Sequence, residues 1–255
     1  MAVLEYHLSD AYANTDGSGR WSYYCPGGGY IPNARFDGRD SVVGASSVAQ
    51  ALAAYRAKYN AALTYASACT LSIFVDFDST TRFLKVKSRT TKIDAFSNTR
   101  LRYAIAQNKV TSTWSHVVRK MLPNYNGVVI PDTLSIGATF ADSQSYTLST
   151  SWTPRNCNVV VFVQIDNSVL PKPVLRSTES GLFPTWVYGD ANKDGIADIS
   201  DVVYLQNYLF LGTAAPKPLA GGDPNYDCNV DIADVIYLIN YLFVNGPAPL
   251  KGCAW

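Results

Sequence analysis

An internal repeat near the C-terminus limits the fold of this chain more strongly than any other pattern in the sequence. The segment DVVYLQNYLF at residues 201–210 returns as DVIYLINYLF at residues 234–243, with eight of ten positions identical at an offset of 33 residues. A duplicated unit of this length is a supersecondary element that buries its apolar face against its copy. The C-terminal part of the chain is therefore expected to contain two similar helices that pack together.

Each copy of the repeat follows a loop rich in oxygen-bearing side chains. The first loop, DANKDGIADISD, occupies residues 190–201 and has the register of an EF-hand calcium loop, with glycine at position 6 and a backbone carbonyl at position 7. Its crowded carboxylates repel one another until a divalent cation neutralises them. The candidate calcium ligands are Asp190, Asn192, Asp194, Ile196 through its carbonyl, Asp198 and Asp201.

The second loop, DPNYDCNVDIAD, repeats this register over residues 223–234. Its candidate ligands are Asp223, Asn225, Asp227, Asn229 through its carbonyl, Asp231 and Asp234. It departs from the pattern at position 6, where Cys228 must accept a backbone conformation that disfavours a Cβ atom and costs about 1 kcal/mol or more. A disulfide from Cys228 to Cys253 is a candidate for holding that geometry. Two such loops, each followed at once by an apolar helix, predict two calcium ions.

Two further features separate these loops from a complete EF-hand. Position 12 is Asp instead of Glu in both loops, and no helix precedes either loop. Over about residues 188–253 the pattern resembles the type I dockerin, a module of two calcium-loop-plus-helix repeats that binds cohesin domains in extracellular bacterial assemblies. In that family, positions 10 and 11 of each loop help to select the partner. The resemblance therefore implies a partner-binding face at Ile199, Ser200, Ile232 and Ala233.

The apolar period changes along the first two-thirds of the chain. Residues 1–45 alternate short apolar runs with Gly-rich turns, which predicts strands and loops. Residues 46–66 have apolar side chains at helical spacing and a high alanine content, which predicts an amphipathic helix. From Cys69 to about Arg176 the period is two, in several short segments separated by polar turns. This alternation predicts an antiparallel β-sandwich.

The expected fold class is thus a multidomain protein that is mainly β with some α. Residues 171–184 are rich in Pro, Ser and Thr, as is typical of a linker. The predicted domains are an α/β segment at residues 1–66, a β-sandwich at 67–175, a linker at 176–187 and the calcium-loop domain at 188–255.

The segments NTRLRYAIAQNKV, HVVRKMLPNYNG and SWTPRNCNVVVFVQ resemble the β-sandwich half of a family of secreted bacterial proteins described as related to an outer-membrane protein. In that family a thioredoxin-like domain precedes the sandwich. The start of the chain, with GYIPNARFDGR, is similar to the second half of such a domain, and Ile31–Pro32 stands at its expected cis-proline turn. The resemblance covers most of residues 2–170. Because no redox-cysteine strand and helix precede Ala2, the thioredoxin-like part is expected to be truncated.

Composition argues against most chemical functions. The net charge of +1 gives no general attraction to nucleic acid, and no apolar run is long enough to span a bilayer. Five cysteines without a CxxC pair argue against zinc and a dithiol centre, and permit two disulfides plus one thiol. Besides Cys228–Cys253, a disulfide between Cys69 and Cys157 is the second expected pair, which leaves Cys25 free. With two histidines and no nucleophile motif, no catalytic residue is expected.

These patterns lead to the hypothesis of a non-enzymatic extracellular or cell-surface calcium-binding protein. Its repeats would mediate calcium-dependent contacts with another protein, with self-assembly of a homo-oligomer into a surface layer or fibre as the favoured form. One alternative is a component of a cell-surface complex that docks onto a cohesin-like domain. Another is a thioredoxin-like redox protein that lacks its active-site half.

Overall fold

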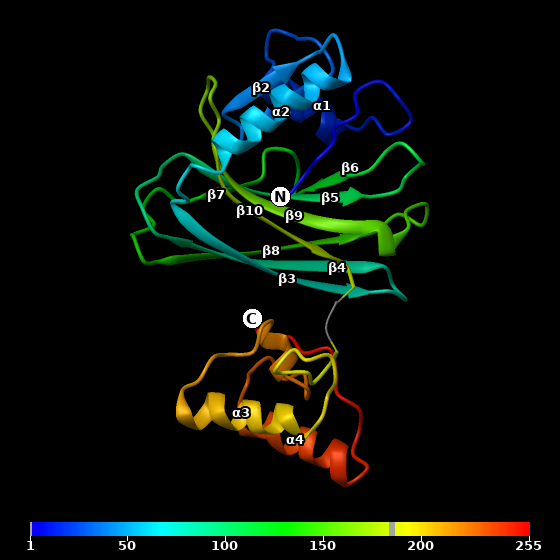
Figure 1. Ribbon diagram of the computed structural model, residues 1–255, viewed down its shortest axis with the longest axis vertical. Coiled ribbons are helices and arrows are strands. Elements are labelled where there is room, and N and C mark those ends of the chain that lie inside the picture. The colour runs from blue at the N-terminus through cyan, green and yellow to red at the C-terminus, as the bar shows by residue number, and fades with distance from the viewer. Residues whose placement is uncertain (1, 184–186) are drawn as a thin grey trace. The chain divides into compact units, whose positions relative to one another are not determined.

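The computed structural model describes residues 2–183 and 187–255, which divide into two compact units (Figure 1). The first unit is Met1–Leu182 and the second is Phe183–Trp255. Each has its own cluster of buried apolar side chains. None of the helices in the described part of the chain combines the length and apolar character that crossing a membrane requires.

Two antiparallel sheets form most of the first unit. The larger sheet has the order β10-β9-β5-β6, with β7 also paired to β5. Its strands are β5 (Thr99–Gln107), β6 (Val117–Leu122), β7 (Val128–Ile130), β9 (Cys157–Ile165) and β10 (Val174–Gly181). The smaller sheet has the order β3-β4-β8. Its strands are β3 (Cys69–Asp78), β4 (Phe83–Lys92) and β8 (Thr139–Thr147). A mainly antiparallel β fold with some helices is thereby confirmed.

The two sheets face each other across a buried layer. Alternate residues of β4 are buried, including Leu84, Val86 and Ser88, as expected for a strand with one face on a core. The Ser88 hydroxyl lies 2.6 Å from the hydroxyl of Tyr103 in β5, which joins the sheets directly. Strands β5 and β9 are buried on both faces. A further layer must therefore cover the other side of the larger sheet.

That layer comes from the start of the chain and contains two helices and a hairpin (Figure 1). Its elements are α1 (Thr15–Tyr24), β1 (Asn33–Phe36), β2 (Asp40–Val43) and α2 (Val48–Ala62). The Asn14 amide donates to the Val118 carbonyl at 2.9 Å, and the buried Arg20 donates to Gln164 Oε1 at 2.8 Å. These bonds attach α1 to the larger sheet. The Ile31–Pro32 peptide bond between α1 and β1 is cis.

The prediction of strands and loops over residues 1–45 was wrong at α1. This helix begins after Asn14, whose side chain accepts the N–H of Gly17 at 2.9 Å, and it contains two glycines. Glycine weakens a helix by about 1 kcal/mol relative to alanine. The local sequence therefore does not indicate a helix here, and packing against the sheet stabilises it. The helix expected within residues 46–66 is present as α2.

The predicted linker at residues 176–187 was wrong in its first half. Residues 176–181 belong to β10, which pairs with β9 as far as Gly181 opposite Asn158. The Ser and Thr content of these residues reflects an edge strand whose outer side chains meet solvent. Residues 184–186 of the predicted linker lie outside the described part of the chain.

The predicted disulfide between Cys69 and Cys157 was also wrong, because both are free, buried thiols. Cys69 begins β3 close to β10, since the neighbouring Ser67 hydroxyl donates to the Leu175 carbonyl at 2.8 Å. Leu175 adjoins the residue of β10 that pairs with Gln164, which stands seven residues after Cys157 in β9. Seven residues of strand span about 23 Å. The two thiols therefore lie near opposite ends of β9.

The second unit holds the two helices that the repeat predicts, α3 (Ile199–Leu211) and α4 (Ile232–Phe243). They pack against each other through a shared apolar core (Figure 1). Its buried members are Ala191, Val202, Leu205, Val235 and Leu238. Each helix begins within the last residues of one of the oxygen-rich loops, so the duplicated sequence is a duplicated structure.

Candidate calcium loops and partner face

The two loops share an unusual backbone conformation at matching positions. At position 4, Lys193 and Tyr226 both have a φ of 65°. At position 6, Gly195 has a φ of 97° and Cys228 a φ of 69°. All four lie in the left-handed region that L-residues with a Cβ seldom adopt. The second loop thus keeps the path of the first even where glycine is replaced by cysteine.

The first aspartate of each loop fixes this path by accepting backbone hydrogen bonds. In the first loop, the Asp190 carboxylate accepts the N–H of Asp194 at 3.0 Å and of Gly195 at 2.9 Å. In the second, the Asp223 carboxylate accepts the N–H groups of Asp227 and Cys228, both at 3.2 Å. Each loop therefore folds back around a buried carboxylate.

Position 12 joins each loop to its helix. Asp198 and Asp231 cap the N-termini of α3 and α4, and each helix start forms a capping box with the aspartate three residues on. In these boxes, Asp201 Oδ2 accepts the Asp198 N–H at 2.9 Å and Asp234 Oδ2 accepts the Asp231 N–H at 2.8 Å. Both position 12 side chains are fully buried. The positive end of the helix dipole favours these carboxylates.

Position 5 fixes position 7, whose carbonyl is the expected ligand. The Ile196 N–H donates to Asp194 Oδ1 at 3.0 Å, and the Asn229 N–H donates to Asp227 Oδ1 at 2.9 Å. The same bond thus recurs in both loops. It sets the orientation of the peptide group next to the carbonyl.

The buried carboxylates fit a divalent cation. Asp234 Oδ1 is buried and has no hydrogen-bond partner among the described residues. Burial, together with the nearby carboxylates of Asp223 and Asp227, raises the pKa of Asp234 to about 7. Burial also raises the pKa of Asp201, and the Asp190 carboxylate adds to this shift. A calcium ion would neutralise this crowded negative charge and satisfy the open oxygen.

In each loop, an asparagine amide donates a hydrogen bond to one carboxylate oxygen of the aspartate at position 5. Asn192 Nδ2 donates to Asp194 Oδ2 at 2.8 Å, and Asn225 Nδ2 donates to Asp227 Oδ2 at 2.9 Å. The Asn192 bond, together with the Ile196 N–H, lowers the pKa of Asp194. Within the described ranges, no three acidic, histidine or cysteine side chains are grouped so as to hold a metal by themselves. The oxygen set of each loop also includes amide and backbone oxygens, which such a grouping does not count.

The four residues of the predicted partner face are all exposed. Ile199 and Ile232 are 51% and 49% accessible, respectively, although each begins an apolar helix. Ser200 and Ala233 follow them on the surface. The Ser200 hydroxyl also donates to Asp194 Oδ2 at 3.3 Å, so it belongs in part to the first loop.

The exposed apolar surface extends beyond the four residues of the predicted partner face. Val203 and Phe210 continue it on α3, and Ile236 and Phe243 continue it on α4. They stand four and eleven residues after the first residue of their helices, a spacing that places them on one side of an α-helix. We call Ile199, Val203, Phe210, Ile232, Ile236 and Phe243 the apolar stripes. Helical periodicity within the repeat could have identified them.

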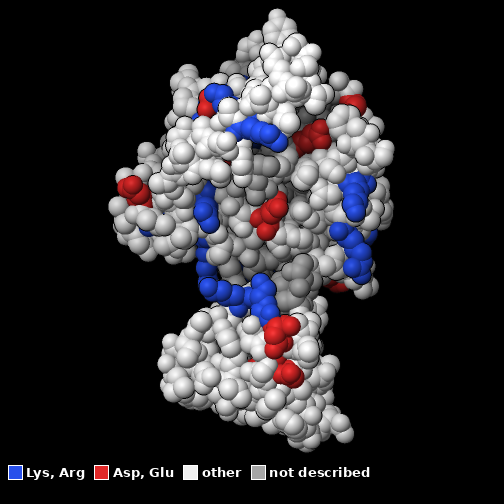
Figure 2. Space-filling model, viewed as in Figure 1, with Lys and Arg blue, Asp and Glu red and all other residues white. Residues whose placement is uncertain are grey.

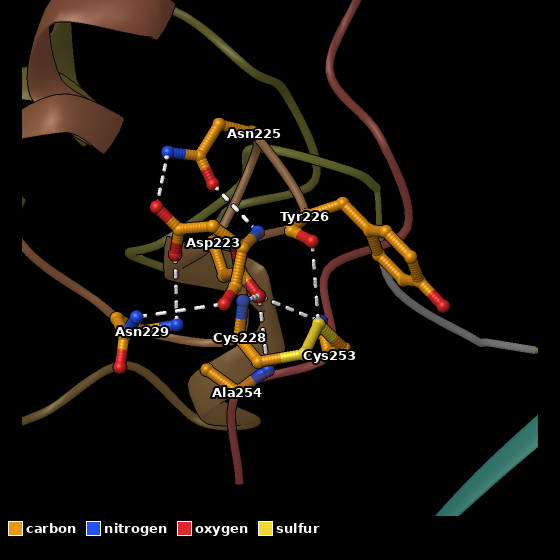
Figure 3. Close-up of a disulfide and its surroundings, with 8 residues drawn as sticks. Asp223, Asn225, Tyr226, Cys228, Asn229, Cys253 and Ala254 are labelled. Carbon is orange, nitrogen blue, oxygen red and sulfur yellow. Dashed lines mark hydrogen bonds between the residues drawn. A yellow bond between two sulfur atoms is a disulfide. The ribbon is translucent and has the colours of Figure 1, made fainter.

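The last residues of the chain are held against the second loop, as Figure 3 shows. Cys228 and Cys253 form the expected disulfide. Asp223 Oδ2 also accepts the backbone N–H groups of Cys253 at 2.7 Å and Ala254 at 2.9 Å. The cysteine spacing hinted at this proximity, but no side-chain pattern could reveal two backbone donors.

Charged residues make up 16% of the chain. On the face drawn in Figure 2, Lys, Arg, Asp and Glu form small separate groups among uncharged residues, and the unit with α3 and α4 shows few of them. This distribution agrees with a formal net charge of +1. A net charge this small gives the chain little long-range electrostatic attraction to a charged partner.

The duplicated loops and helices define a class of small module built from EF-hand-like repeats. Within that class, residues 188–243 match the family model of the dockerin type I domain. This match supports calcium-dependent protein–protein interaction by the C-terminal repeats. Comparison of the whole chain with curated proteins finds no match.

Solved structures add a likeness of fold. The chain is similar to HBP35 of Porphyromonas gingivalis, with a TM-score of 0.54 and 12% identity over 71% of this chain. It spans 64% of the length of that structure. A domain of the outer membrane lipoprotein Omp28 from Porphyromonas gingivalis also matches, with a TM-score of 0.36 and 12% identity over 46% of this chain and 98% of that one. At this identity, the HBP35 likeness concerns the fold alone.

Proposed function

We propose that this chain is a non-enzymatic extracellular or cell-surface protein whose two calcium ions hold a protein-docking face in shape. The observation that carries the proposal is the pair of apolar stripes, which repeat on α3 and α4 and each begin at position 10 of a calcium loop. Ile199 and Ile232 lie next to the aspartates that cap the helices. Calcium bound in a loop therefore orders the first residue of the stripe beside it.

Exposed apolar side chains arranged in this way mark a binding surface. A soluble monomer seldom exposes a contiguous large apolar patch, whereas interface cores are rich in such residues. Phe210 and Phe243 are 67% and 66% accessible, respectively, at matching positions of the repeat. Their burial against a partner would remove large aromatic surfaces from water and so stabilise the complex.

The favoured partner is a second copy of this chain, which leads to a homo-oligomeric surface layer or fibre. Two similar faces on one molecule can each engage a neighbour, and repeated engagement extends an assembly. The alternative partner is a separate cohesin-like domain, which the dockerin match favours. Both partners use the same stripes, so the two forms of the proposal share one surface.

The N-terminal unit would then be the structural part of each subunit in the assembly. We interpret its facing sheets as a β-sandwich. The order α1, β1, β2 and α2 supports the interpretation of this layer as a thioredoxin-like segment. The edges of the two-stranded β1-β2 sheet are places where a neighbouring chain could add a strand. A redox activity is disfavoured, because Cys25 is not near a second cysteine in the sequence.

Light scattering coupled to size-exclusion chromatography, in calcium and then in chelator, tests this proposal. We expect the mass to exceed that of one chain in calcium and to return to one chain in chelator. Ile199→Asp with Ile232→Asp should abolish the association, whereas Ile136→Asp, at a 64% accessible apolar residue of the first unit, should not. A monomer that binds an immobilised cohesin domain would select the alternative partner. If the protein is monomeric under both conditions and does not bind the cohesin domain, the proposal is wrong.

A further inference from the structure

The two calcium loops differ in how their first ligand is supported. In the first loop, Asp190 Oδ2 accepts one backbone N–H, from Gly195 at 2.9 Å. In the second, Asp223 Oδ2 accepts three, from Cys228 at 3.2 Å, Cys253 at 2.7 Å and Ala254 at 2.9 Å (Figure 3). The two shortest bonds come from the end of the chain, which lies outside the loop itself.

These donors fix the carboxylate of Asp223. Backbone N–H groups stabilise the charged form of a carboxylate and hold its orientation. With Oδ2 taken up by three donors, Oδ1 retains a single backbone donor, Asp227 at 3.2 Å. Partners of this kind that orient a metal ligand commonly change metal affinity when they are lost. The C-terminal segment thus acts as a positioning element for the second loop.

Close packing holds this segment in place. The Leu250 N–H donates to the Pro224 carbonyl at 2.9 Å, and Cys253 and Ala254 are buried. Gly252 has a φ of 70°, and a Cβ added there would lie 2.0 Å from the Ala220 carbonyl oxygen. Because the segment packs this closely, a small shift would separate the Cys253 and Ala254 N–H groups from Asp223. Besides these contacts, the Cys228–Cys253 disulfide ties it to the loop.

We propose that the Cys228–Cys253 disulfide makes the second calcium loop sensitive to redox state, because its reduction frees the C-terminal donors from Asp223. The inference rests on the proposed calcium binding and adds a regulation that acts on one loop alone. The first loop has glycine at position 6, and its Asp190 carboxylate takes the backbone donors Asp194 and Gly195 from within the loop itself, so reduction leaves it unchanged.

A dithiol is the reductant that this step requires. Its thiolate attacks Sγ of Cys228, which is exposed, and Cys253 leaves as a thiolate that takes a proton from water. The second thiol of the reagent then displaces Cys228 and closes its own disulfide. Two electrons and two protons pass to the protein in total, giving two cysteine thiols and one oxidised dithiol.

Hydrogen–deuterium exchange of the full chain during a calcium titration reads both loops in the same molecule. The calcium concentration that half-protects residues 190–201 reports the first loop, and that for residues 223–234 reports the second. After dithiothreitol treatment, we expect the value for the second loop to rise by about tenfold to a hundredfold. The value for the first loop should stay within about threefold of its value in the oxidised protein. Residues 249–255 should lose protection from exchange even without calcium. Mass analysis after alkylation confirms that two thiols have formed.

A glycine pair separates the effect of the donors from the effect of the disulfide. Gly252→Ala pushes the C-terminal segment off Ala220 while both cysteines remain. It should therefore weaken calcium binding by the second loop even without reductant. Gly212→Ala is the matched control, because Gly212 has a φ of 66° and a Cβ added there would meet nothing within 4 Å. It carries the same left-handed strain and should leave both loops unchanged.

Three other outcomes are decisive. Unchanged values for both loops in the reduced protein would overturn the inference and leave the calcium proposal standing. An equal shift in both loops would also overturn it, because the whole unit would then have loosened. If calcium protects neither loop in the oxidised chain, the proposed calcium function itself fails.

Discussion

At the residue scale, Tyr103 links the two sheets of the first unit through one buried hydroxyl. It lies 2.6 Å from the Ser88 hydroxyl and donates to Asp142 Oδ2 at 2.7 Å. Burial raises the pKa of Tyr103 well above its ordinary value, so the hydroxyl keeps its proton and remains a donor. Both partners come from the opposite sheet.

Tyr103→Phe should therefore lower the free energy of unfolding of the first unit by about 1–3 kcal/mol, because Ser88 loses its partner in a dry layer. Urea denaturation followed by tryptophan fluorescence measures this change. Tyr146→Phe is the matched control, since the Tyr146 hydroxyl bonds to no other residue in the described part of the chain. Equal effects of the two substitutions would show that the Tyr103 hydroxyl does not stabilise the contact between the two sheets.

The free cysteines should differ sharply in reactivity. Burial raises the pKa of the Cys157 thiol to about 11, an effect that outweighs the nearby Arg119 and Arg82, and burial also raises the pKa of Cys69. Because a thiol reacts as its thiolate, a pKa of 11 leaves about one molecule in a thousand reactive at pH 8. Cys25 is only partly buried.

Iodoacetamide at pH 8 should accordingly modify Cys25 first in the native chain and leave Cys69 and Cys157 largely unmodified. The modification rate of Cys157 should rise about tenfold for each pH unit until the pH approaches 11, provided that the protein stays folded. Peptide mass analysis at timed intervals gives these rates, and a denatured sample is the control for equal intrinsic reactivity. Modification of Cys157 as fast as Cys25 at pH 8 would contradict the assignment.

Single residues could be predicted where chemistry fixes spacing. The strict alternation of Asp and Asn identified both loops, and the register placed Cys228 in the left-handed conformation that it has, with a φ of 69°. The backbone donors of Cys253 and Ala254 could not be predicted in this way. A main-chain N–H carries no sequence signal, and its partner Asp223 lies 30 residues away from the nearer one.

At the scale of elements, the two helices of the N-terminal layer start from different kinds of cap. Asn14 accepts the Gly17 N–H at 2.9 Å and also donates to the Val118 carbonyl of β6 at 2.9 Å. Ser47 accepts the Gln50 N–H at 3.2 Å, and its bond is exposed to solvent. The first cap therefore fixes both a helix and its attachment to the sheet.

Asn14→Ala should be more damaging than Ser47→Ala for this reason. Loss of either cap costs about 0.5–2 kcal/mol, and Asn14→Ala also leaves the Val118 carbonyl without its side-chain donor, which adds about 1 kcal/mol. Thermal unfolding monitored by circular dichroism compares the two variants, with Asn14→Asp as a variant that keeps the cap but loses the donor. A larger loss for Ser47→Ala would contradict the attachment of α1 through Asn14.

Elements could be predicted where the period of apolar residues was undisturbed. Strand β3 begins at Cys69, where the alternation begins, and β9 matches its continuous apolar run, as expected for a strand buried on both faces. Strand β10 has the composition of a linker because an edge strand needs few apolar residues. Helix α1 has no clear signal in the sequence because its capping side chain and buried Arg20 act through contacts with distant strands.

At the scale of the whole molecule, the chain consists of two units with separate cores. Both candidate calcium loops belong to the second unit. A ligand that binds only the folded state stabilises it by about 2.7 kcal/mol at a concentration of 100 times its Kd. That stabilisation belongs to the unit that binds the ligand, whereas the first unit, with its own core of strands, gains nothing from it.

Differential scanning calorimetry should consequently show two transitions, of which calcium moves one. For a unit of this size, stabilisation by a single ion at that concentration corresponds to an increase in Tm of about 10–20 °C. The transition of the first unit should shift by less than about 2 °C. Asp190→Ala with Asp194→Ala should reduce the calcium shift of the second unit, because the first loop loses two carboxylates. A single transition that moves as a whole with calcium would mean that the two cores unfold together, and the docking face would then depend on the stability of the entire chain.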